Sequence, residues 1–592
     1  MMVEFIKKPI HKAISSVLQQ LEVATKRLKV MNVSKTSPKK KIVLSTKELK
    51  IAGMPVGSKV FVDVDTVSGG LVVRTAQFAN KGVRTISYRE YKNRQGIEPV
   101  LDIRHQEDIN KAIGDAEHVH VTFKKGEVRI RPINDIASYD AHAKFNEMKV
   151  DADGVYANVL SVVDMVREKR FTSLDIEADA DFLESRECLL LCLQLRRLGY
   201  DIETSEQGLL ALRDGAVSSN VTQIDLSANF HEVTPAVLNT DTPLSSFTMC
   251  TGGVDVYAMA KEGFVNESVL EWRPPEKRDF SKTVSKKTGE TTVRFNDKTD
   301  TGALCAALNC PDVKVLFNED IYTVDEAMVA EYVGQVNHMS GALQCDDFSC
   351  LKNANDRAKA IASLDTTIDM FFNVLRLLKA VNAPTLLMEN VRNFATSMEA
   401  KLFTKGLQRL GYTVNMAVMN AKHYQGMTNR ERAFVFASKL DAPFAFPAPV
   451  ENTKHADSDV VAKHLDEMRD LTHTKTVQAG IEQGRIRYIS EGDALAPTIV
   501  RSQAKQTKDA VYIKRGDRYY LPSNTITKAL MGIGEDFDMS PFSNEIGSEI
   551  VGQSIEVPMH QMIGAQIKRH IEAALNAIVP VRKTPTQLSL FA

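Results

Sequence analysis

Three short segments of the sequence place reactive side chains beside apolar runs. Cys345 lies within GALQCDDFS. Glu389 and Asn390 follow PTLLM directly, whereas Arg430 and Arg432 precede AFVFA. A partly exposed thiol can act as a nucleophile, and a buried carboxyl can hold a proton near neutral pH. Two arginines spaced two residues apart on a strand point the same way and can hold one planar, polar ligand. Nucleophilic chemistry on such a ligand needs these residue types.

A glycine turn forms a second group of candidate residues. The run SSFTM predicts a short strand, and the turn Thr251-Gly252-Gly253 leads into a helical pattern, VDVYAMAKEGF. The next strand, NESVLEW, ends on Glu271, beside the only tryptophan, Trp272. Such a turn lets the backbone approach a ligand, and an acid after the next strand can bind ribose hydroxyls. These residues fit a nucleoside cofactor; the alternatives are an ordinary turn and a core aromatic.

The spacing of apolar residues predicts the scaffold that positions these groups. From about residue 243 to 440, short apolar strands alternate with helical patterns, as is typical of a parallel sheet with crossover helices. One of these strands, VKVLFNEDI, ends near Asp320, and TTIDMFFNVLRLLKAV predicts an amphipathic helix before the buried strand PTLLM. Open α/β sheets bind ligands at the carboxyl ends of their strands. We therefore predict a doubly wound, Rossmann-like α/β domain with its site along one sheet edge.

The rest of the sequence divides where the hydrophobic pattern changes. Period-two alternation predicts two hairpins, GSKVFVDVDTVSGGLVVRTA and HVHVTFKKGEVRIRPI, whereas residues 155–215 have helical spacing. The predicted units are a basic helix with a linker (1–41), a β-rich accessory domain (42–150), a small helical module (151–240), the α/β domain (241–440), a small domain (441–545), a segment that returns to the α/β domain (546–580) and a flexible tail (581–592).

Composition excludes several classes of protein. The chain has 592 residues, of which 43% are hydrophobic and 25% charged, so it can bury a large core and is not a disordered or fibrous protein. Seven irregularly spaced cysteines predict a reduced, cytoplasmic protein without a disulfide framework. No apolar run approaches the length of a membrane span. The formal net charge is −1, but residues 1–50 carry twelve Lys or Arg against three Asp or Glu.

Taken in order, these segments resemble the cytosine-5 DNA methyltransferases. TMCTGG resembles the family's F-x-G-x-G-G, and EW and Asp320-Ile321 follow in the family order. QCDDFS resembles P-C-Q-x-F-S, ENV is intact, and TNRER resembles Q-x-R-x-R. Near the end, IVGQSIEVP resembles G-N-S-V-x-x-P. The resemblance covers residues 243–440 and 517–580. The sequence departs from the family's patterns at Thr248, Cys250, Gln344, Asp346, Thr428 and Gln553, which leaves the fit of the cofactor and the loop around the thiol open.

The resemblance implies a role for each of the reactive residues. Cys345 would add to carbon 6 of cytosine, and Glu389 would hold a proton at ring nitrogen 3. Arg430 and Arg432 would grip the base carbonyl, with Asn390 in the same catalytic set. A base inside double-stranded DNA cannot be attacked from its face, so the cytosine would be flipped out. The region 441–515 would recognise the target.

The resemblance also implies S-adenosyl-L-methionine as the methyl donor, and no metal is expected. Glu271 would contact its ribose, Asp320 its adenine amino group and Trp272 its adenine face. The complete implied cofactor set is Met249, Thr251, Gly252, Gly253, Glu271, Trp272, Asp320, Ile321, Gln553 and Ser554. Three alternatives remain: an RNA cytosine methyltransferase, a non-catalytic DNA-binding protein that kept the fold, and a nicotinamide-dependent reductase on the same sheet.

The last residues suggest a partner. The pentapeptide from Gln587 to Phe591 resembles the motif by which bacterial replication and repair proteins dock on the sliding clamp. Gln587 would be the polar anchor, and Leu588, Leu590 and Phe591 would supply the apolar contacts. A leucine and an aromatic on a frayed tail gain nothing for the fold, so burial in a partner is a physical reason for them. The alternative is a tail that folds back on the enzyme. We expect a monomer, in the bacterial cytoplasm with the nucleoid.

Overall fold

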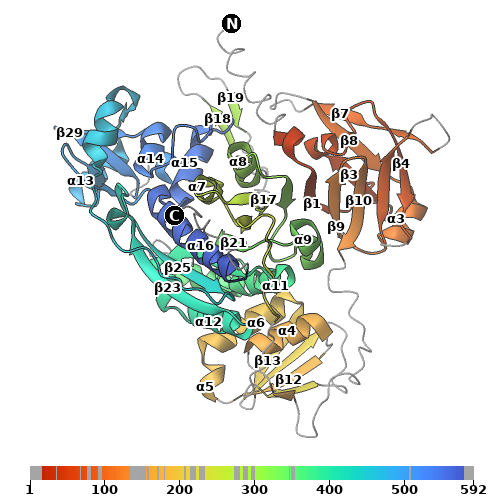
Figure 1. Ribbon diagram of the computed structural model, residues 1–592. Helices are drawn as coiled ribbons and strands as arrows, with labels where there is room; N and C mark the ends of the chain where they lie inside the picture. Colours follow the sequence, from red (N-terminus) through yellow and green to blue (C-terminus); the bar gives the residue numbers. More distant parts are fainter. Residues whose placement is uncertain are drawn as a thin grey trace, which may run out of the picture.

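The computed structural model describes residues 17–578 apart from short internal segments (Figure 1). The residues within that range that are not described are 35, 67–68, 77–81, 91–96, 134–154, 157–158, 170–172, 179, 206–207, 214–221, 226–233, 273–280, 285–290, 295–300, 346, 349–353 and 506–508. The clamp-like pentapeptide lies outside the described residues.

A sheet of 13 strands runs through the molecule, and seven of its strands form the predicted α/β domain. In spatial order these are β23 (Thr413–Asn420), β25 (Glu431–Ser438), β22 (Thr385–Val391), β21 (His338–Ala342), β16 (Ser245–Met249), β17 (Val265–Leu270) and β20 (Val315–Asn318). The five strands from β22 to β20 are parallel, and β25 is antiparallel to both of its neighbours. Chain order reverses between β16 and β21. The prediction of a doubly wound sheet is confirmed.

Helices cover both faces of this sheet because each has one apolar stripe. On one face, buried Met559, Ile563, Ile567 and Ile571 follow a four-residue period along one helix and pack on Phe434 and Phe436. The helices of this face are α7 (Val254–Lys261), α8 (Thr301–Asn309) and α16 (Val557–Ile578). The helices of the other face are α9 (Glu326–Val333), α11 (Phe371–Val381) and α12 (Met398–Arg409). The segment predicted to return and complete the domain therefore does so through α16.

The N-terminal β domain continues the same sheet. Strand β1 (Val23–Lys29) pairs in parallel with β20 and antiparallel with β9 (His118–Lys124). The predicted basic helix within residues 1–41 is therefore wrong over Val23–Lys29, where the β-branched Val23 and Thr25 favour a strand. Both predicted hairpins are confirmed, since β4 (Lys59–Val64) pairs with β5 (Leu71–Thr75), and β9 with β10 (Glu127–Ile133). The β-rich domain also contains β3 (Lys40–Ser45), β7 (Ser87–Glu90), β8 (Ile97–Ile103) and α3 (Gln106–Ala112).

The unit predicted as a helical module is an α/β module with a sheet of its own. Its helices include α4 (Val159–Lys169) and α6 (Arg186–Arg197), as the spacing predicts. They pack on five strands that the sequence interpretation missed: β11 (Val155–Tyr156), β15 (Thr222–Asp225), β12 (Ser173–Glu177), β14 (Gly208–Arg213) and β13 (Tyr200–Ser205). These strands are only two to six residues long, so their alternation was too brief to compete with the neighbouring helical pattern. In Figure 1 the module lies below α11 and α12.

The region over residues 441–545, for which a small domain is predicted, contains a four-stranded sheet of its own. Its sheet has the order β26 (Arg469–Asp470), β30 (Arg518–Leu521), β29 (Val511–Arg515) and β27 (Arg487–Ile489), next to α13 (Lys475–Glu482) and α14 (Asn524–Leu530). Helix α15 (Asn544–Gln553) then leads to α16. Among the described helices, none is both long enough and apolar enough to cross a membrane.

Candidate functional site

The five parallel strands bring the predicted segments to one edge of the sheet. Backbone hydrogen bonds continue beyond the strand ends: Cys250 N donates to Leu270 O at 2.7 Å, and Glu271 N to Phe317 O at 3.0 Å. Leu343 N likewise donates to Glu389 O at 3.1 Å. The segments that carry the thiol, the acid and the cofactor residues are therefore neighbours, although up to about 140 positions separate them in the sequence (389 minus 250).

A buried acid–base pair lies at the end of β22. Arg432 Nε is 2.6 Å from Glu389 Oε1, and the antiparallel pairing of β22 with β25 fixes this approach by placing Val391 opposite Arg432. Burial raises the pKa of Glu389, and the two nearby arginines, Arg432 and Arg430, oppose that rise. Glu389 can therefore hold a proton more tightly than an exposed carboxyl does.

The side-chain amide of Asn390 has a hydrogen-bond donor that a ligand could use. Its side-chain oxygen accepts a hydrogen bond from Val391 N at 2.7 Å, which fixes the amide. Its Nδ2 is buried and has no hydrogen-bond partner among the described residues. A buried donor without a partner costs free energy, on the order of 1–3 kcal/mol. An acceptor on a bound substrate would remove this cost.

The loop that carries Cys345 is closed by a turn and anchored by contacts with Thr366 and Met370. Phe348 N donates to Cys345 O at 3.0 Å, and Gln344 N contacts Met370 Sδ at 3.5 Å. Asp347 Oδ2 accepts from Thr366 Oγ1 at 2.8 Å. Cys345 itself is partly exposed, as a nucleophile must be. The loop therefore presents the thiol while its flanks are anchored.

Arg430 has a different environment from the one expected. It precedes β25 and is 2% exposed. Its guanidinium donates to the carbonyls of Ile499 at 3.0 Å, Gly552 at 3.2 Å and Ser554 at 2.7 Å. Burial and the charge of Arg432 lower its pKa to about 9, so it stays charged at neutral pH. These contacts join the small domain and the returning segment to the sheet. Arg430 is thus bound to backbone carbonyls, and the predicted arrangement in which Arg430 and Arg432 together hold the base is not seen.

The glycine turn has the backbone geometry that a close ligand approach needs. Gly253 begins α7 with φ of 93°, and a Cβ there would lie 2.8 Å from Ala306 N of α8. A Cβ on Gly252 would meet no atom within 4 Å, so this glycine faces open space. Cys250 stands where the family has glycine, and its φ of 54° is in the left-handed region that favours glycine.

Carboxyl groups gather around this turn. Burial raises the pKa of the Cys250 thiol, and the charges of Glu271, Asp320 and Asp255 raise it further, so all three acids act on this side of the site. Burial also raises the pKa of Asp255 to about 6, and its carboxyl is hydrogen-bonded to Thr251. Met249 and Ile321 are buried behind the acids, whereas Trp272 is partly exposed. Sequence reasoning missed Asp255, although it follows the turn directly in TGGVD.

The returning segment, residues 546–580, contributes three polar residues to the surroundings of the site. Gln553 ends α15 and is exposed, whereas Ser554 is buried with its Oγ donating to Val551 O at 2.7 Å. Glu556 is fully buried, and its Oε1 accepts from Thr428 N at 3.1 Å. Ser554 therefore contributes to the packing around Arg430 in this structure.

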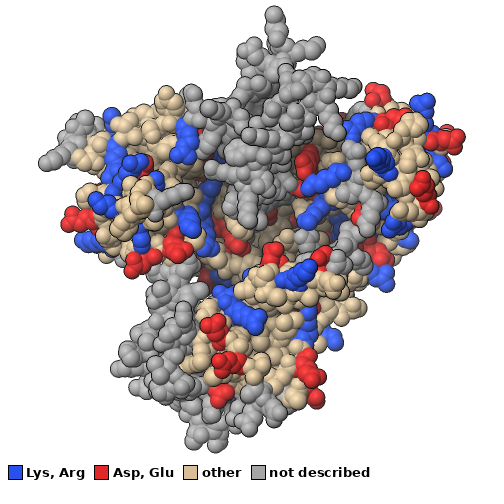
Figure 2. Space-filling view, turned by 180° about the vertical axis from the view of Figure 1, so that it is seen from behind, with Lys and Arg blue, Asp and Glu red and all other residues tan. Residues whose placement is uncertain are grey.

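One face of the molecule is charged on both sides of a hollow (Figure 2). Figure 2 shows Lys and Arg side chains on either side of a central hollow, with acidic side chains inside it. Such an arrangement suits an anionic polymer that crosses the hollow and a cationic small molecule within it. Among the described residues, no cluster of three or more His, Cys, Asp or Glu side chains could hold a metal ion.

Comparisons with known proteins agree with this geometry. The family model described as C-5 cytosine-specific DNA methylase matches residues 313–569. Type II methyltransferase M.NgoBI of Neisseria gonorrhoeae is 24% identical over 217 residues, which cover 34% of this chain and 66% of that protein. Type II methyltransferase M.SsoII of Shigella sonnei is 24% identical over 220 residues, which cover 34% and 58%.

The chain thus spans less than two thirds of the length of these curated relatives. The solved structure of the S. pombe Dnmt2 methyltransferase superposes on 56% of this chain and 98% of its own, with 13% identity and a TM-score of 0.41. The matched segment contains the thiol loop, the ENV strand and the first part of the returning helix α16. Residues 313–569 of this chain are therefore similar to the C-5 cytosine-specific DNA methylase family.

Proposed function

We propose that this protein transfers a methyl group from S-adenosyl-L-methionine to carbon 5 of a cytosine flipped out of double-stranded DNA. The observation that carries the proposal is the buried Glu389–Arg432 pair at 2.6 Å, on the same sheet edge as the partly exposed Cys345. A thiol nucleophile, a carboxyl with a raised pKa and a fixed cation are the three groups that activation of a cytosine ring needs.

Each residue has one task in the proposed mechanism. The Cys345 thiolate adds to carbon 6, which makes carbon 5 nucleophilic. Glu389 holds a proton at ring nitrogen 3 and so limits the negative charge that the adduct places on the ring. Arg432 fixes the Glu389 carboxyl, and the unpartnered Asn390 Nδ2 donates to an acceptor of the base. Once carbon 5 has taken the methyl group, a base removes the carbon-5 proton, and the electrons of that bond re-form the 5,6 double bond and expel the Cys345 thiolate. Arg430 acts through the packing of the small domain, as its three carbonyl contacts support.

The glycine-turn side of the site fits the proposed cofactor. S-adenosyl-L-methionine is a cation that supplies a methyl group on sulfur, and the charges of three acids, Glu271, Asp320 and Asp255, act on the Cys250 thiol there. Glu271 would accept from the ribose, Asp320 would bind the adenine amino group and Trp272 would cover the adenine face. The open space beside Gly252 leaves room for the ligand to approach the backbone. Gln553 would contact the cofactor from the returning segment.

The small domain is the proposed reader of the target sequence. Its sheet exposes Tyr488, and Lys514 Nζ lies 5.3 Å from the centre of that ring and 5.8 Å from that of Tyr519. A lysine held by aromatic rings can contact a phosphate, while the rings offer contact area to the groove. Arg430 joins this domain to the catalytic edge through Ile499 O.

Substitution of the thiol tests the proposed function. Cys345→Ser should abolish methyl transfer to duplex DNA and leave DNA binding close to wild type, because the serine hydroxyl is a far weaker nucleophile. Duplex DNA with 5-fluorocytosine at the target should trap the wild type covalently, since fluorine replaces the proton that must leave. Cys350→Ser is the control; Cys350 lies outside the described residues. Full methylation by Cys345→Ser would refute the assignment, and methylation of transfer RNA alone would replace DNA by RNA as the substrate.

The tail supports a second, separate proposal. Residues Gln587, Leu588, Leu590 and Phe591 would dock on the bacterial sliding clamp with roughly micromolar affinity, because a chain end that becomes ordered on binding loses entropy. The enzyme would then be a monomer in the bacterial cytoplasm that modifies DNA behind the replication fork. Binding to purified clamp should be lost when residues 587–592 are removed. Equal binding by the intact and the shortened chain would contradict this proposal.

A further inference from the structure

A buried carboxylate joins three parts of the molecule. Asp369 precedes α11 and has no exposed surface. Its Oδ2 accepts from Gln194 Nε2 at 2.7 Å and from Arg197 Nε at 2.6 Å, both on α6 of the α/β module. Its Oδ1 accepts from Arg197 Nη2 at 3.1 Å and from Tyr322 OH at 2.9 Å. Tyr322 follows the predicted adenine contact Asp320 by two positions, so one carboxylate links the module to the cofactor edge.

The segment that carries Asp369 also anchors the thiol loop. Thr366 Oγ1 and Thr367 N both donate to Asp347 Oδ2, at 2.8 and 2.9 Å. Met370 receives the neighbouring backbone N–H of Gln344 at 3.5 Å. These three hydrogen bonds to the flanks of Cys345 all have a partner within the five residues 366–370.

Arg197 contacts this anchor at two points. Besides its forked pairing with Asp369, its Nη2 donates to Thr366 O at 2.5 Å. The guanidinium also lies over the ring of Tyr322, 4.3 Å from the centroid. A planar guanidinium with three such contacts defines both the distance and the angle between α6 and the anchor segment, which a lysine cannot do.

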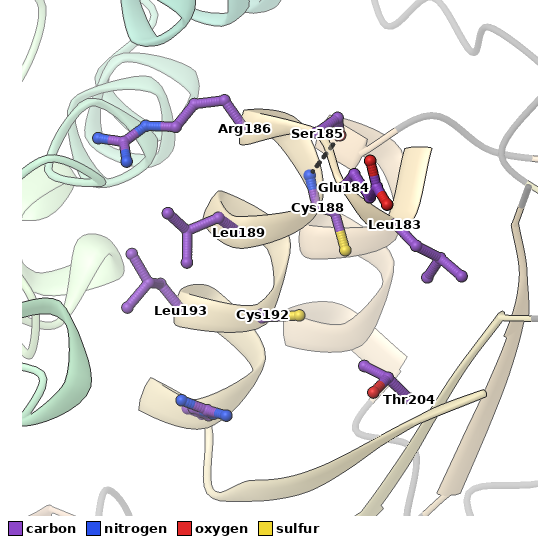
Figure 3. A pocket seen from close by; sticks show the side chains of 10 residues that line it. Leu183, Glu184, Ser185, Arg186, Cys188, Leu189, Cys192, Leu193 and Thr204 are labelled. Atoms are coloured by element: carbon purple, nitrogen blue, oxygen red, sulfur yellow. Dashed lines mark hydrogen bonds between the residues drawn. The ribbon is translucent and has the colours of Figure 1, made fainter. Parts of the chain in front are cut away.

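Helix α6 has two different faces. In Figure 3, Arg186, Leu189 and Leu193 point to the side where the helices of the catalytic domain lie, whereas Cys188 and Cys192 point to the opposite side; all five side chains line one pocket. Leu193 is buried in the same apolar cluster as residues of α11. The module therefore packs on the catalytic domain through the face of α6 that also carries the polar contacts to the anchor segment.

We propose that the α/β module is a positioning element for the catalytic thiol, and that it acts through Arg197 and Asp369. Neither residue touches the substrate. Arg197 fixes the segment 366–370, and this segment fixes Asp347 and Gln344 on either side of Cys345. The proposal rests on the proposed role of Cys345 as the nucleophile. The proposal gives residues 155–225 a role in catalysis that does not require them to bind a ligand.

The test compares two arginines on the same helix. Arg197→Lys keeps the charge but loses the fork. Arg186→Lys is the matched control, because Arg186 pairs with Glu399 of α12 at 2.9 Å in the same interface, away from the thiol loop. Two readouts are needed: the rate at which iodoacetamide alkylates Cys345, followed by peptide mass spectrometry, and the single-turnover rate of methyl transfer to duplex DNA.

In Arg197→Lys, we expect alkylation of Cys345 to be at least about three-fold faster and methyl transfer about ten-fold slower, because a small misplacement of a reacting group is costly. DNA affinity and the unfolding temperature should stay close to wild type. Arg186→Lys should change neither rate. Wild-type rates in Arg197→Lys, or equal changes in both variants, would overturn the proposal. If the wild type itself transfers no methyl group, the proposed function fails, while alkylation still reports on the loop.

Discussion

Glu556 offers the sharpest test of how the returning segment is packed. It is fully buried, and its Oε1 accepts from Thr428 N at 3.1 Å and Thr428 Oγ1 at 2.5 Å. Its Oε2 has no hydrogen-bond partner among the described residues. Burial raises the pKa of Glu556 to about 7, against the opposing effects of Thr428 and of Arg430. The substitution that tests this is Glu556→Gln, which keeps the shape of the side chain and replaces the titratable carboxyl by an amide.

The sign of the effect follows from the direction of this shift. A carboxyl with a raised pKa binds its proton more tightly in the folded state, so folding is favoured most below the ordinary value of 4.5. That contribution is lost as the pH rises through about 7, where the buried group must ionise. A difference of about 2.5 pKa units (7 minus 4.5) corresponds to about 3 kcal/mol. The glutamine variant has no such loss.

We therefore expect Glu556→Gln and wild type to unfold at similar temperatures at pH 5. At pH 8.5 the variant should be more stable by up to about 3 kcal/mol, which is about 6–12 °C for a unit of 150–250 residues. Thermal unfolding followed by circular dichroism measures both. Glu535→Gln is the control, because Glu535 is exposed. The reasoning is refuted if wild type and Glu556→Gln lose stability in parallel between pH 5 and 8.5.

Three further substitutions test the cofactor side of the site. Gly253→Ala should destabilise the protein by roughly 2–4 kcal/mol, measured by thermal unfolding. The new Cβ would lie 2.8 Å from Ala306 N, at a backbone φ of 93°. Wild-type stability of this variant would contradict the close packing of α7 on α8. Glu271→Ala should weaken S-adenosyl-L-methionine binding about ten-fold or more, measured by calorimetry; an unchanged affinity means that the ribose is held elsewhere. The variant Cys250→Gly should be about 0.5–1 kcal/mol more stable towards unfolding than Cys250→Ala, because φ at this position is 54°. The reverse order of stability would show that the turn relaxes.

The sequence predicted the site best where strands end. Cys345, Glu389 and Asp320 follow buried apolar runs, and parallel strands bring their carboxyl ends together, so the order of the motifs sufficed to place them on one edge. The two hairpins of the N-terminal domain were equally accessible, because alternation and a turn residue are local signals.

Long-range contacts were beyond a reading of the sequence alone. The strand β1 was mistaken for a helix because its pairing with β20 joins positions that are 292 residues apart (315 minus 23). Arg430 looked like a ligand-gripping residue, yet it meets carbonyls that lie 69 to 124 positions further along the chain. Asp369 carried no signal at all, since its importance depends on an arginine from a different module. Burial and partners of this kind are set by tertiary packing.

The continuity of the sheet has a consequence for the synthesis of the chain. Strand β1 lies between β9 and β20, but Lys29 is translated 286 positions before Val315 (315 minus 29). At about 5–20 residues per second, the β20 side of β1 stays without its partner for roughly 15–60 seconds. An open strand edge invites pairing with other chains, and charged side chains are the usual protection. Lys26, Arg27 and Lys29 on β1 place three positive charges on the strand that waits longest for its partner, the kind of residue that disfavours such pairing.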